Sequence, residues 1–239
     1  MGSAPLPLKL AERESERVTS MKERIALNLN TIGCRIKEAA ERVNRSAEDV
    51  TLVAVTKSVG LDEILALYEL GIRDFGENRL DVALEKIKQC PSDIRWHYLA
   101  PVQTRKARDI AARFTVADAV DRVRAAEVLQ KRCEELDCHL EILVEVNVSG
   151  EESKHGFDES LLSEAVERIR RMDRLSLQGL MTMAPWEAEE KVLRRCFAGL
   201  KKLCVAHNLP VCSMGMTDDF EIAIEEGSTQ VRIGRALFV

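Results

Sequence analysis

One lysine and two glycine-containing turns have the residue types and the spacing for chemistry in this sequence. Lys57 directly follows an apolar run over 50–56, and the turns over 213–219 and 232–235 combine glycine with hydroxyl, carboxylate and guanidinium groups. A deprotonated lysine amine condenses with an aldehyde to form a Schiff base. Glycine turns and arginine side chains bind phosphate through backbone N–H groups and positive charge. Together these residues predict a phosphorylated ligand that carries an aldehyde.

The apolar run before Lys57 predicts a parallel strand that is buried on both faces. Parallel α/β folds place their functional residues at the carboxyl ends of such strands. Burial of Lys57 against Val53, Val55 and a neighbouring arginine would favour the neutral amine that a nucleophile requires. The alternative is that Lys57 merely ends a strand and faces solvent, since lysine is nearly always exposed.

Strand-like and helical patterns alternate along the chain, which predicts an α/β fold with right-handed βαβ units and a parallel sheet. Eight such units favour a single (β/α)8 TIM barrel, with an open doubly wound sheet as the alternative. No Gly-x-Gly-x-x-Gly motif follows the first strand, which disfavours a dinucleotide-binding fold. The predicted strands are 50–57, a short one ending at 75–78, 94–99, 115–120, 140–147, 175–183, 211–216 and 230–234; the predicted helices between them are 62–70, 80–88, 104–113, 122–136, 158–172, 188–207 and 219–225.

The amino-terminal part of the sequence stands apart from this alternation. Residues 1–18 are polar and contain two prolines, so we expect a flexible extension there. Apolar residues then recur at helical spacing over 18–43, which predicts an amphipathic helix added to the barrel. We therefore expect one barrel domain over 19–239.

Composition excludes several classes of protein. The 239 residues carry a net charge of −5, which argues against non-specific binding to nucleic acid or to anionic membranes. No apolar segment approaches the ~20 residues that span a bilayer. The seven cysteines are scattered and accompany no secretory signal, so we expect reduced thiols and a cytoplasmic location. Cys133, Cys138 and His139 match no common zinc spacing, and we expect no metal site.

The strand ends of a barrel converge on one face, so the candidate residues would meet there. Lysine and phosphate-binding turns in one site match pyridoxal 5′-phosphate (PLP), which has both an aldehyde and a phosphate. The alternative is an ordinary helix cap with surface arginines beside it. His97 and His155 lie near the same face and are interpreted as structural hydrogen-bonding groups. The candidate phosphate-binding residues are Ser213, Gly215, Thr217, Arg232, Gly234 and Arg235.

Several of these motifs occur together in an order that resembles the pyridoxal phosphate homeostasis protein family. The resemblance covers about 25–238. It rests on Ala54-Val55-Thr56-Lys57, Phe75-Gly76-Glu77-Asn78, Trp96-His97-Tyr98, 146–154, Gly179-Leu180-Met181-Thr182-Met183, 213–219 and Val231-Arg232-Ile233-Gly234.

The resemblance implies a barrel like the amino-terminal domain of alanine racemase, with PLP bound covalently as an aldimine on Lys57. It implies that Arg232 faces the pyridine nitrogen and that Asn78 and Met181 line the ring. It further implies that the phosphate is held by Ser213, Thr217 and the backbone amides of Gly234 and Arg235.

The sequence departs from the family pattern at two places. Ala100-Pro101-Val102-Gln103 replaces a glycine followed by Leu-Gln, so one wall of the site is expected to differ. Arg235 stands where the family has threonine or serine, which removes a hydroxyl and adds a positive charge.

Two functions agree with this site. The resemblance implies a protein that carries or buffers PLP without a dedicated reaction and that passes it to apo PLP-dependent enzymes. The alternative is a PLP-dependent amino-acid racemase with Lys57 as its base. We favour the carrier because the sequence ends soon after the last predicted strand, which leaves no second domain to supply an opposing base. We expect a monomer or a weak homodimer.

Overall fold

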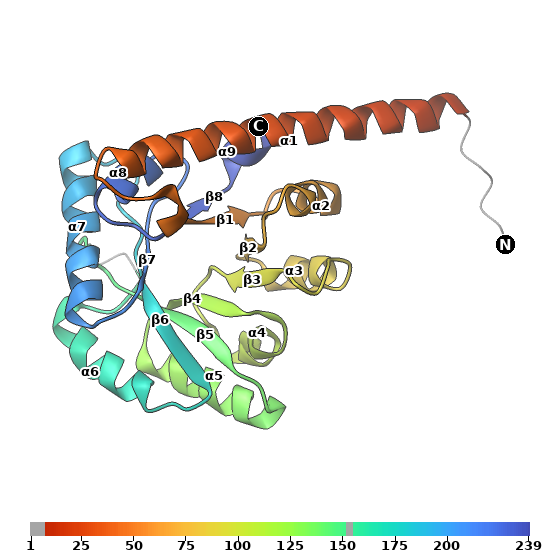
Figure 1. Ribbon diagram of the computed structural model, residues 1–239. Helices are drawn as coiled ribbons and strands as arrows, with labels where there is room; N and C mark the ends of the chain where they lie inside the picture. The colour runs from red at the N-terminus through yellow and green to blue at the C-terminus, as the bar shows by residue number, and fades with distance from the viewer. Residues whose placement is uncertain (1–7, 152–154) are drawn as a thin grey trace.

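Eight parallel strands close into one barrel in chain order, with β8 paired to β1 (Figure 1). The structure, a computed structural model, describes residues 8–151 and 155–239. The prediction of a closed (β/α)8 barrel is confirmed, and the alternative of an open sheet is wrong. The strands are β1 (Thr51–Val55), β2 (Asp74–Glu77), β3 (Arg95–Tyr98), β4 (Val116–Val120), β5 (Leu140–Glu145), β6 (Leu175–Met181), β7 (Val211–Ser213) and β8 (Gln230–Ile233).

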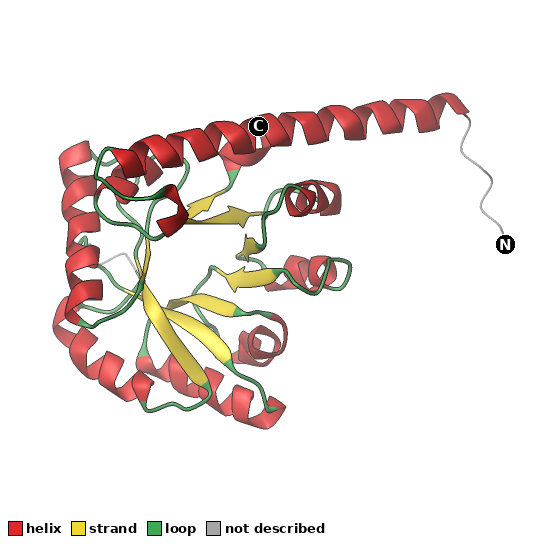
Figure 2. Cartoon of the chain, viewed as in Figure 1, coloured by secondary structure: helices red, strands yellow, loops and turns green. Residues whose placement is uncertain are grey.

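Helices alternate with the strands and cover the outside of the barrel (Figure 2). Within the described ranges, none of them is long and apolar enough to cross a bilayer. The α-helices are α1 (Leu8–Glu41), α2 (Leu61–Glu69), α3 (Leu80–Ile87), α4 (Ala107–Arg113), α5 (Val123–Leu136), α6 (Glu159–Arg170), α7 (Glu190–Ala206), α8 (Phe220–Glu225) and α9 (Arg235–Phe238); two short 3-10 helices are η1 (Ala47–Asp49) and η2 (Thr104–Lys106).

α1 and α9 differ from the sequence prediction, η1 was not predicted, and β7 ends at Ser213 instead of residue 216. α1 begins at Leu8, although the apolar pattern placed its start near residue 18. Residues 1–7 of the expected flexible extension lie outside the described residues, and the expected domain boundary stays a prediction. α9 was not predicted, because a helix of four residues is too short to show a helical period.

The register between β1 and β8 brings the two ends of the sequence pattern together. Ala54 pairs with Ile233, so the residues that follow β1 and those that follow β8 leave the barrel side by side. Lys57 thereby lies near the turn that begins at Gly234. This pairing is the structural basis of the candidate site.

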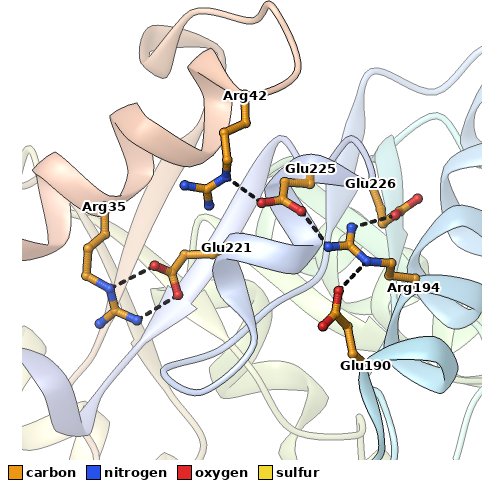
Figure 3. Close-up of polar contacts among 7 residues, drawn as sticks. All are labelled: Arg35, Arg42, Glu190, Arg194, Glu221, Glu225 and Glu226. Carbon is orange, nitrogen blue, oxygen red and sulfur yellow. Dashed lines mark hydrogen bonds and ion pairs between the residues drawn. The ribbon is translucent and has the colours of Figure 1, made fainter.

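α1 packs along the barrel beside α8 and α9 (Figure 1). Its buried residues Ile25, Ile32 and Ile36 recur at helical spacing and form the apolar contact. Ion pairs also connect α1, α8 and α7, as Figure 3 shows: Arg35–Glu221, Arg42–Glu225, and Arg194 with Glu190, Glu225 and Glu226. Half-exposed ion pairs each contribute little to stability, so the burial of apolar side chains provides most of the free energy that keeps α1 packed on the barrel.

Candidate functional site

A cavity of about 470 Å³ opens at the carboxyl ends of the strands. Its size falls in the range of small-molecule sites. Residues that follow β1, β2, β3, β6, β7 and β8 form its wall, so the convergence predicted from the sequence is found. The lining residues are Val55, Lys57, Ser58, Asn78, Leu99, Met183, Trp186, Met216, Thr217, Asp218, Arg232, Gly234, Arg235, Phe238 and Val239.

Lys57 lines this cavity with an exposed side chain. Val53 is buried below it, and Val55 shares the cavity wall. The predicted burial of Lys57 is therefore wrong, because Lys57 stands beyond the last paired residue of β1, where the wall is open. The alternative, in which Lys57 faces solvent, agrees with its exposed side chain. It does not account for the place of Lys57 in the wall of a ligand-sized cavity.

A buried ion pair that the sequence analysis missed holds the strand end behind Lys57. Lys86 Nζ on α3 donates to Glu77 Oε1 at 2.6 Å and to the carbonyl oxygen of Thr56 at 2.7 Å. Thr56 Oγ1 donates to the same Glu77 oxygen at 2.8 Å. Because Lys86 follows the buried Ala83 by three residues, the spacing could have placed Lys86 on the buried face of α3, but it could not have identified Glu77 as its partner.

The turn after β7 is shaped by Gly215. Its φ of +95° lies in the left-handed region, and a Cβ there would stand 2.6 Å from Ala223 Cβ and 2.9 Å from Phe220 Cα. Only glycine lets α8 approach this closely. Asp219 accepts a hydrogen bond from the N–H of Met216 at 2.6 Å, so its carboxylate closes the turn. Gly215 thus shapes the cavity without lining it.

Arg232 reaches the cavity from β8, and Ser213 lies beneath it. Arg232 is 6% exposed and donates from Nη1 to Ser213 Oγ at 2.6 Å and from Nη2 to the carbonyl oxygen of Thr182 at 3.0 Å. Ser213 is fully buried and absent from the cavity wall. The contact of Ser213 with phosphate stays a prediction; its hydroxyl here accepts hydrogen bonds from Arg232 and Gln230.

Gly234 and Arg235 mark the start of α9, where backbone N–H groups lack helical carbonyl partners. Both residues line the cavity, as does Thr217 from the preceding turn. Arg235 Nη2 lies 2.8 Å from Asp218 Oδ2 in an exposed ion pair. The added positive charge predicted at Arg235 is therefore already balanced by a neighbouring carboxylate.

Asn78 and Met181 take different places. Asn78 lines the cavity, and its Oδ1 is buried without a hydrogen-bond partner among the described residues. Met181 instead packs inside the barrel with Val116 and Leu143, while Met183 lines the cavity. The contact of Met181 with the ligand stays a prediction; the structure places Met181 at the end of β6, outside the cavity wall.

Comparisons with known proteins agree with this architecture. The family model described as alanine racemase, N-terminal domain, matches residues 27–239. A protein of Pseudomonas aeruginosa named pyridoxal phosphate homeostasis protein is 38% identical over 90% of this chain and 94% of its own length. An Escherichia coli K12 protein of the same name is 37% identical over 90% of this chain and 95% of its own length. The chain belongs to the pyridoxal phosphate homeostasis protein family.

Solved structures place this family member beside two kinds of neighbour. PipY of Synechococcus elongatus with PLP bound has a TM-score of 0.76 and 28% identity, covering 85% of this chain and all of PipY (100%). A protein of Bifidobacterium adolescentis described as unknown has a TM-score of 0.84 and 33% identity, covering 92% and 96% of the two chains. Alanine racemase of Clostridium difficile, at 15% identity, a TM-score of 0.71 and coverage of 90% and 56%, shows the fold alone.

The cavity fits a ligand with an aldehyde, a phosphate and a ring nitrogen. Lys57 offers an amine, Thr217 a hydroxyl, and Gly234 a backbone amide at a helix start. Arg232 offers N–H donors to an acceptor such as the ring nitrogen. Asn78 Oδ1 lacks a hydrogen-bond partner within the described part of the chain. These groups complement the functional groups of PLP.

Proposed function

We propose that this protein binds PLP covalently through the Lys57 amine and holds it for intracellular PLP homeostasis. The observation that carries the proposal is that Lys57, Thr217, Arg232 and Gly234 line one cavity. The names of its relatives and the PLP-bound structure of PipY support it. PLP supplies a reactive aldehyde, and the protein supplies the site that keeps this aldehyde away from other amines.

The residues divide the binding between the two ends of the ligand. The neutral amine of Lys57 would condense with the aldehyde of PLP, with the aldehyde oxygen leaving as water. The Thr217 hydroxyl and the amides of Gly234 and Arg235 hold the phosphate at the start of α9. Arg232 donates to the ring nitrogen and takes no proton from it, since a guanidinium stays charged. We leave Ser213 and Met181 out of this set because both lie inside the barrel.

Holding rather than turnover is the function that this cavity supports. Racemisation requires proton transfer on both faces of a planar carbanion, hence two acid–base groups. Of the described lining residues, Lys57 supplies an amine, whereas Asp218 is ion-paired with Arg235. The similarity to alanine racemase, at 15% identity, supports a shared fold but does not support racemisation by this protein.

We further infer that apo PLP-dependent enzymes receive the cofactor and that the protein acts in the cytoplasm as a monomer or a weak homodimer. Among the described residues no cysteine forms a disulfide, which agrees with a reducing compartment. Light scattering across a concentration series measures the oligomeric state. Activation of an apo PLP-dependent enzyme by the loaded protein measures transfer.

The decisive experiment is spectroscopic. Purified protein mixed with PLP should develop an imine absorption band that borohydride bleaches, and Lys57→Ala should lose it. Lys88→Ala is the matched control, because Lys88 is exposed outside the cavity and pairs with Glu85. A wild-type protein that develops no band and takes up no PLP would overturn the proposal.

A second measurement separates holding from turnover. The loaded protein is incubated with L- and D-amino acids, one at a time. Stoichiometric release or exchange of PLP supports holding. Multiple-turnover racemisation would show instead that the protein is an enzyme.

A further inference from the structure

The guanidinium of Arg232 lies at the cavity and donates hydrogen bonds only to uncharged oxygen atoms among the described residues. Its guanidinium donates to Ser213 Oγ and to the carbonyl oxygen of Thr182, and within the described residues it forms no ion pair. Burial lowers the pKa of Arg232, and the negative charge of Asp118 is the strongest opposing influence. The carboxylate that attracts Arg232 most is therefore not its hydrogen-bond partner.

Gln230 stands between these two charges. Its Nε2 donates to Asp118 Oδ2 at 2.8 Å and to Ser213 Oγ at 2.9 Å. Ser213 Oγ in turn accepts from Arg232 Nη1 at 2.6 Å. All of these side chains are at least nine-tenths buried, so water does not compete for their hydrogen bonds.

The far side of Asp118 is fixed by His97. His97 Nδ1 lies 2.8 Å from Asp118 Oδ1, and its Nε2 lies 3.0 Å from Asp74 Oδ1. Two carboxylates accept from the ring, so both ring nitrogens carry protons. Burial lowers the pKa of His97, but the two carboxylates outweigh it and raise the pKa to about 9. Asp118 is thus an anchored carboxylate whose second oxygen is occupied by Gln230.

We propose that Gln230 is a positioning residue, a neutral spacer that keeps the Arg232 guanidinium at the ligand cavity instead of in an ion pair with Asp118. The inference rests on the proposed function, in which Arg232 donates to the ring nitrogen of PLP. A charge-assisted hydrogen bond is roughly twice as strong as a neutral one, so a direct pair is the favoured alternative. The amide of Gln230 blocks it by occupying the Asp118 oxygen and the Ser213 hydroxyl together.

Removing the spacer should draw Arg232 into the barrel. Gln230→Ala leaves Asp118 Oδ2 buried without a donor, and Arg232 turns toward it. We expect the Kd for PLP to rise by at least about tenfold, the weight of one charged hydrogen bond. Ser228→Ala is the matched control, because it removes buried hydrogen bonds to the carbonyl oxygens of Met214 (2.8 Å) and Gln230 (3.0 Å) without contacting Arg232. Its Kd should stay within about twofold of the wild type.

A charged spacer gives a pH signature that a purely structural role would not produce. Gln230→Glu introduces a carboxylate that competes for Arg232, so PLP binding should weaken at neutral pH. As pH falls, protonated Glu resembles Gln, and the ratio of variant to wild-type Kd should return toward one. The carboxylates that act on Arg232 are Asp118, Asp219 and Glu145, and His97 pairs with the far oxygen of Asp118.

The outcomes separate this inference from the proposed function. Weakened binding in both variants, pH rescue of Gln230→Glu, and a ligand-free crystal structure of Gln230→Ala with Arg232 bonded to Asp118 support the spacer. Wild-type affinity in Gln230→Ala with Arg232 unmoved overturns it. If the wild-type protein does not bind PLP, the proposed function fails. The position of Arg232 in the crystal structure of Gln230→Ala then tests by itself whether Gln230 keeps Arg232 away from Asp118. If Gln230→Ala does not fold, the pH ratio of Gln230→Glu decides.

Discussion

Lys86 Nζ on α3 lies 2.6 Å from Glu77 Oε1 at the end of β2, and the same ammonium donates to the carbonyl oxygen of Thr56 at 2.7 Å. The residue after Thr56 is Lys57, which carries the proposed imine. One buried ion pair therefore connects α3 with the ends of β1 and β2 at the point where the ligand amine emerges.

Breaking this ion pair should be costly. Lys86→Met leaves the buried Glu77 carboxylate without a counter-charge, and we expect the free energy of unfolding to fall by about 3–5 kcal/mol. Urea denaturation measures the change. Lys88→Ala, in an exposed pair with Glu85, should change stability by less than about 1 kcal/mol. The double variant Lys86→Met with Glu77→Leu should recover much of the loss, and no recovery would contradict a role for charge.

Gly215 should not tolerate a side chain. Gly215→Ala places a Cβ 2.6 Å from Ala223 Cβ at a φ of +95°, so we expect a loss of about 1–3 kcal/mol in the free energy of unfolding. Gly33→Ala is the matched control, since Gly33 lies within α1 with nothing within 4 Å of the added carbon. That variant should gain about 0.5–1 kcal/mol from helix propensity. Equal effects of the two substitutions would show that packing at α8 is not decisive.

Asn28 should matter for ligand binding although it lies on α1, outside the cavity. Its Nδ2 donates to the carbonyl oxygens of Leu237 and Val239, each at 3.2 Å. A four-residue helix such as α9 is too short to be stable alone, so its place in the cavity wall depends on such contacts. We expect Asn28→Ala to weaken PLP binding by about 2–10-fold, the weight of one or two neutral hydrogen bonds.

Isothermal titration or the visible absorption band measures this affinity. Lys22→Ala is the control, because Lys22 on the same helix pairs with Glu69 of α2 instead. A parallel fall in both variants would mean that α1 acts only on global stability.

His97 should make stability depend on pH. Its pKa rises from 6.5 to about 9 on folding, because Asp118 and Asp74 outweigh the opposite effect of burial. A raised pKa in the folded state stabilises the protein fully below the unfolded value. This contribution, on the order of a few kcal/mol, is lost as pH rises from about 6.5 through about 9.

Urea midpoints across this pH window test the linkage. The wild type should lose stability with a slope that His97→Gln flattens, whereas the exposed His139→Gln should keep the wild-type slope. An unchanged slope in His97→Gln would mean that the ring is neutral in the folded protein.

Sequence patterns alone determined the barrel and most of its candidate site. The apolar run before Lys57, the regular alternation of helices and strands, and the glycine turns near 215 and 234 are local signals. A barrel gathers all its strand ends on one face, so position along the chain was enough to bring Lys57, Thr217 and Arg232 together.

Only the tertiary structure decided which layer of the barrel each side chain occupies. Met181 and Ser213 are buried outside the cavity wall, whereas Lys57 lines the cavity with an exposed side chain. The pairs Lys86–Glu77 and His97–Asp118, and the spacer Gln230, were also beyond the sequence. Strand register sets these layers, and buried polar groups must find partners on other strands. The spacing of residues along the sequence predicts neither the strand register nor the partner of a buried polar group.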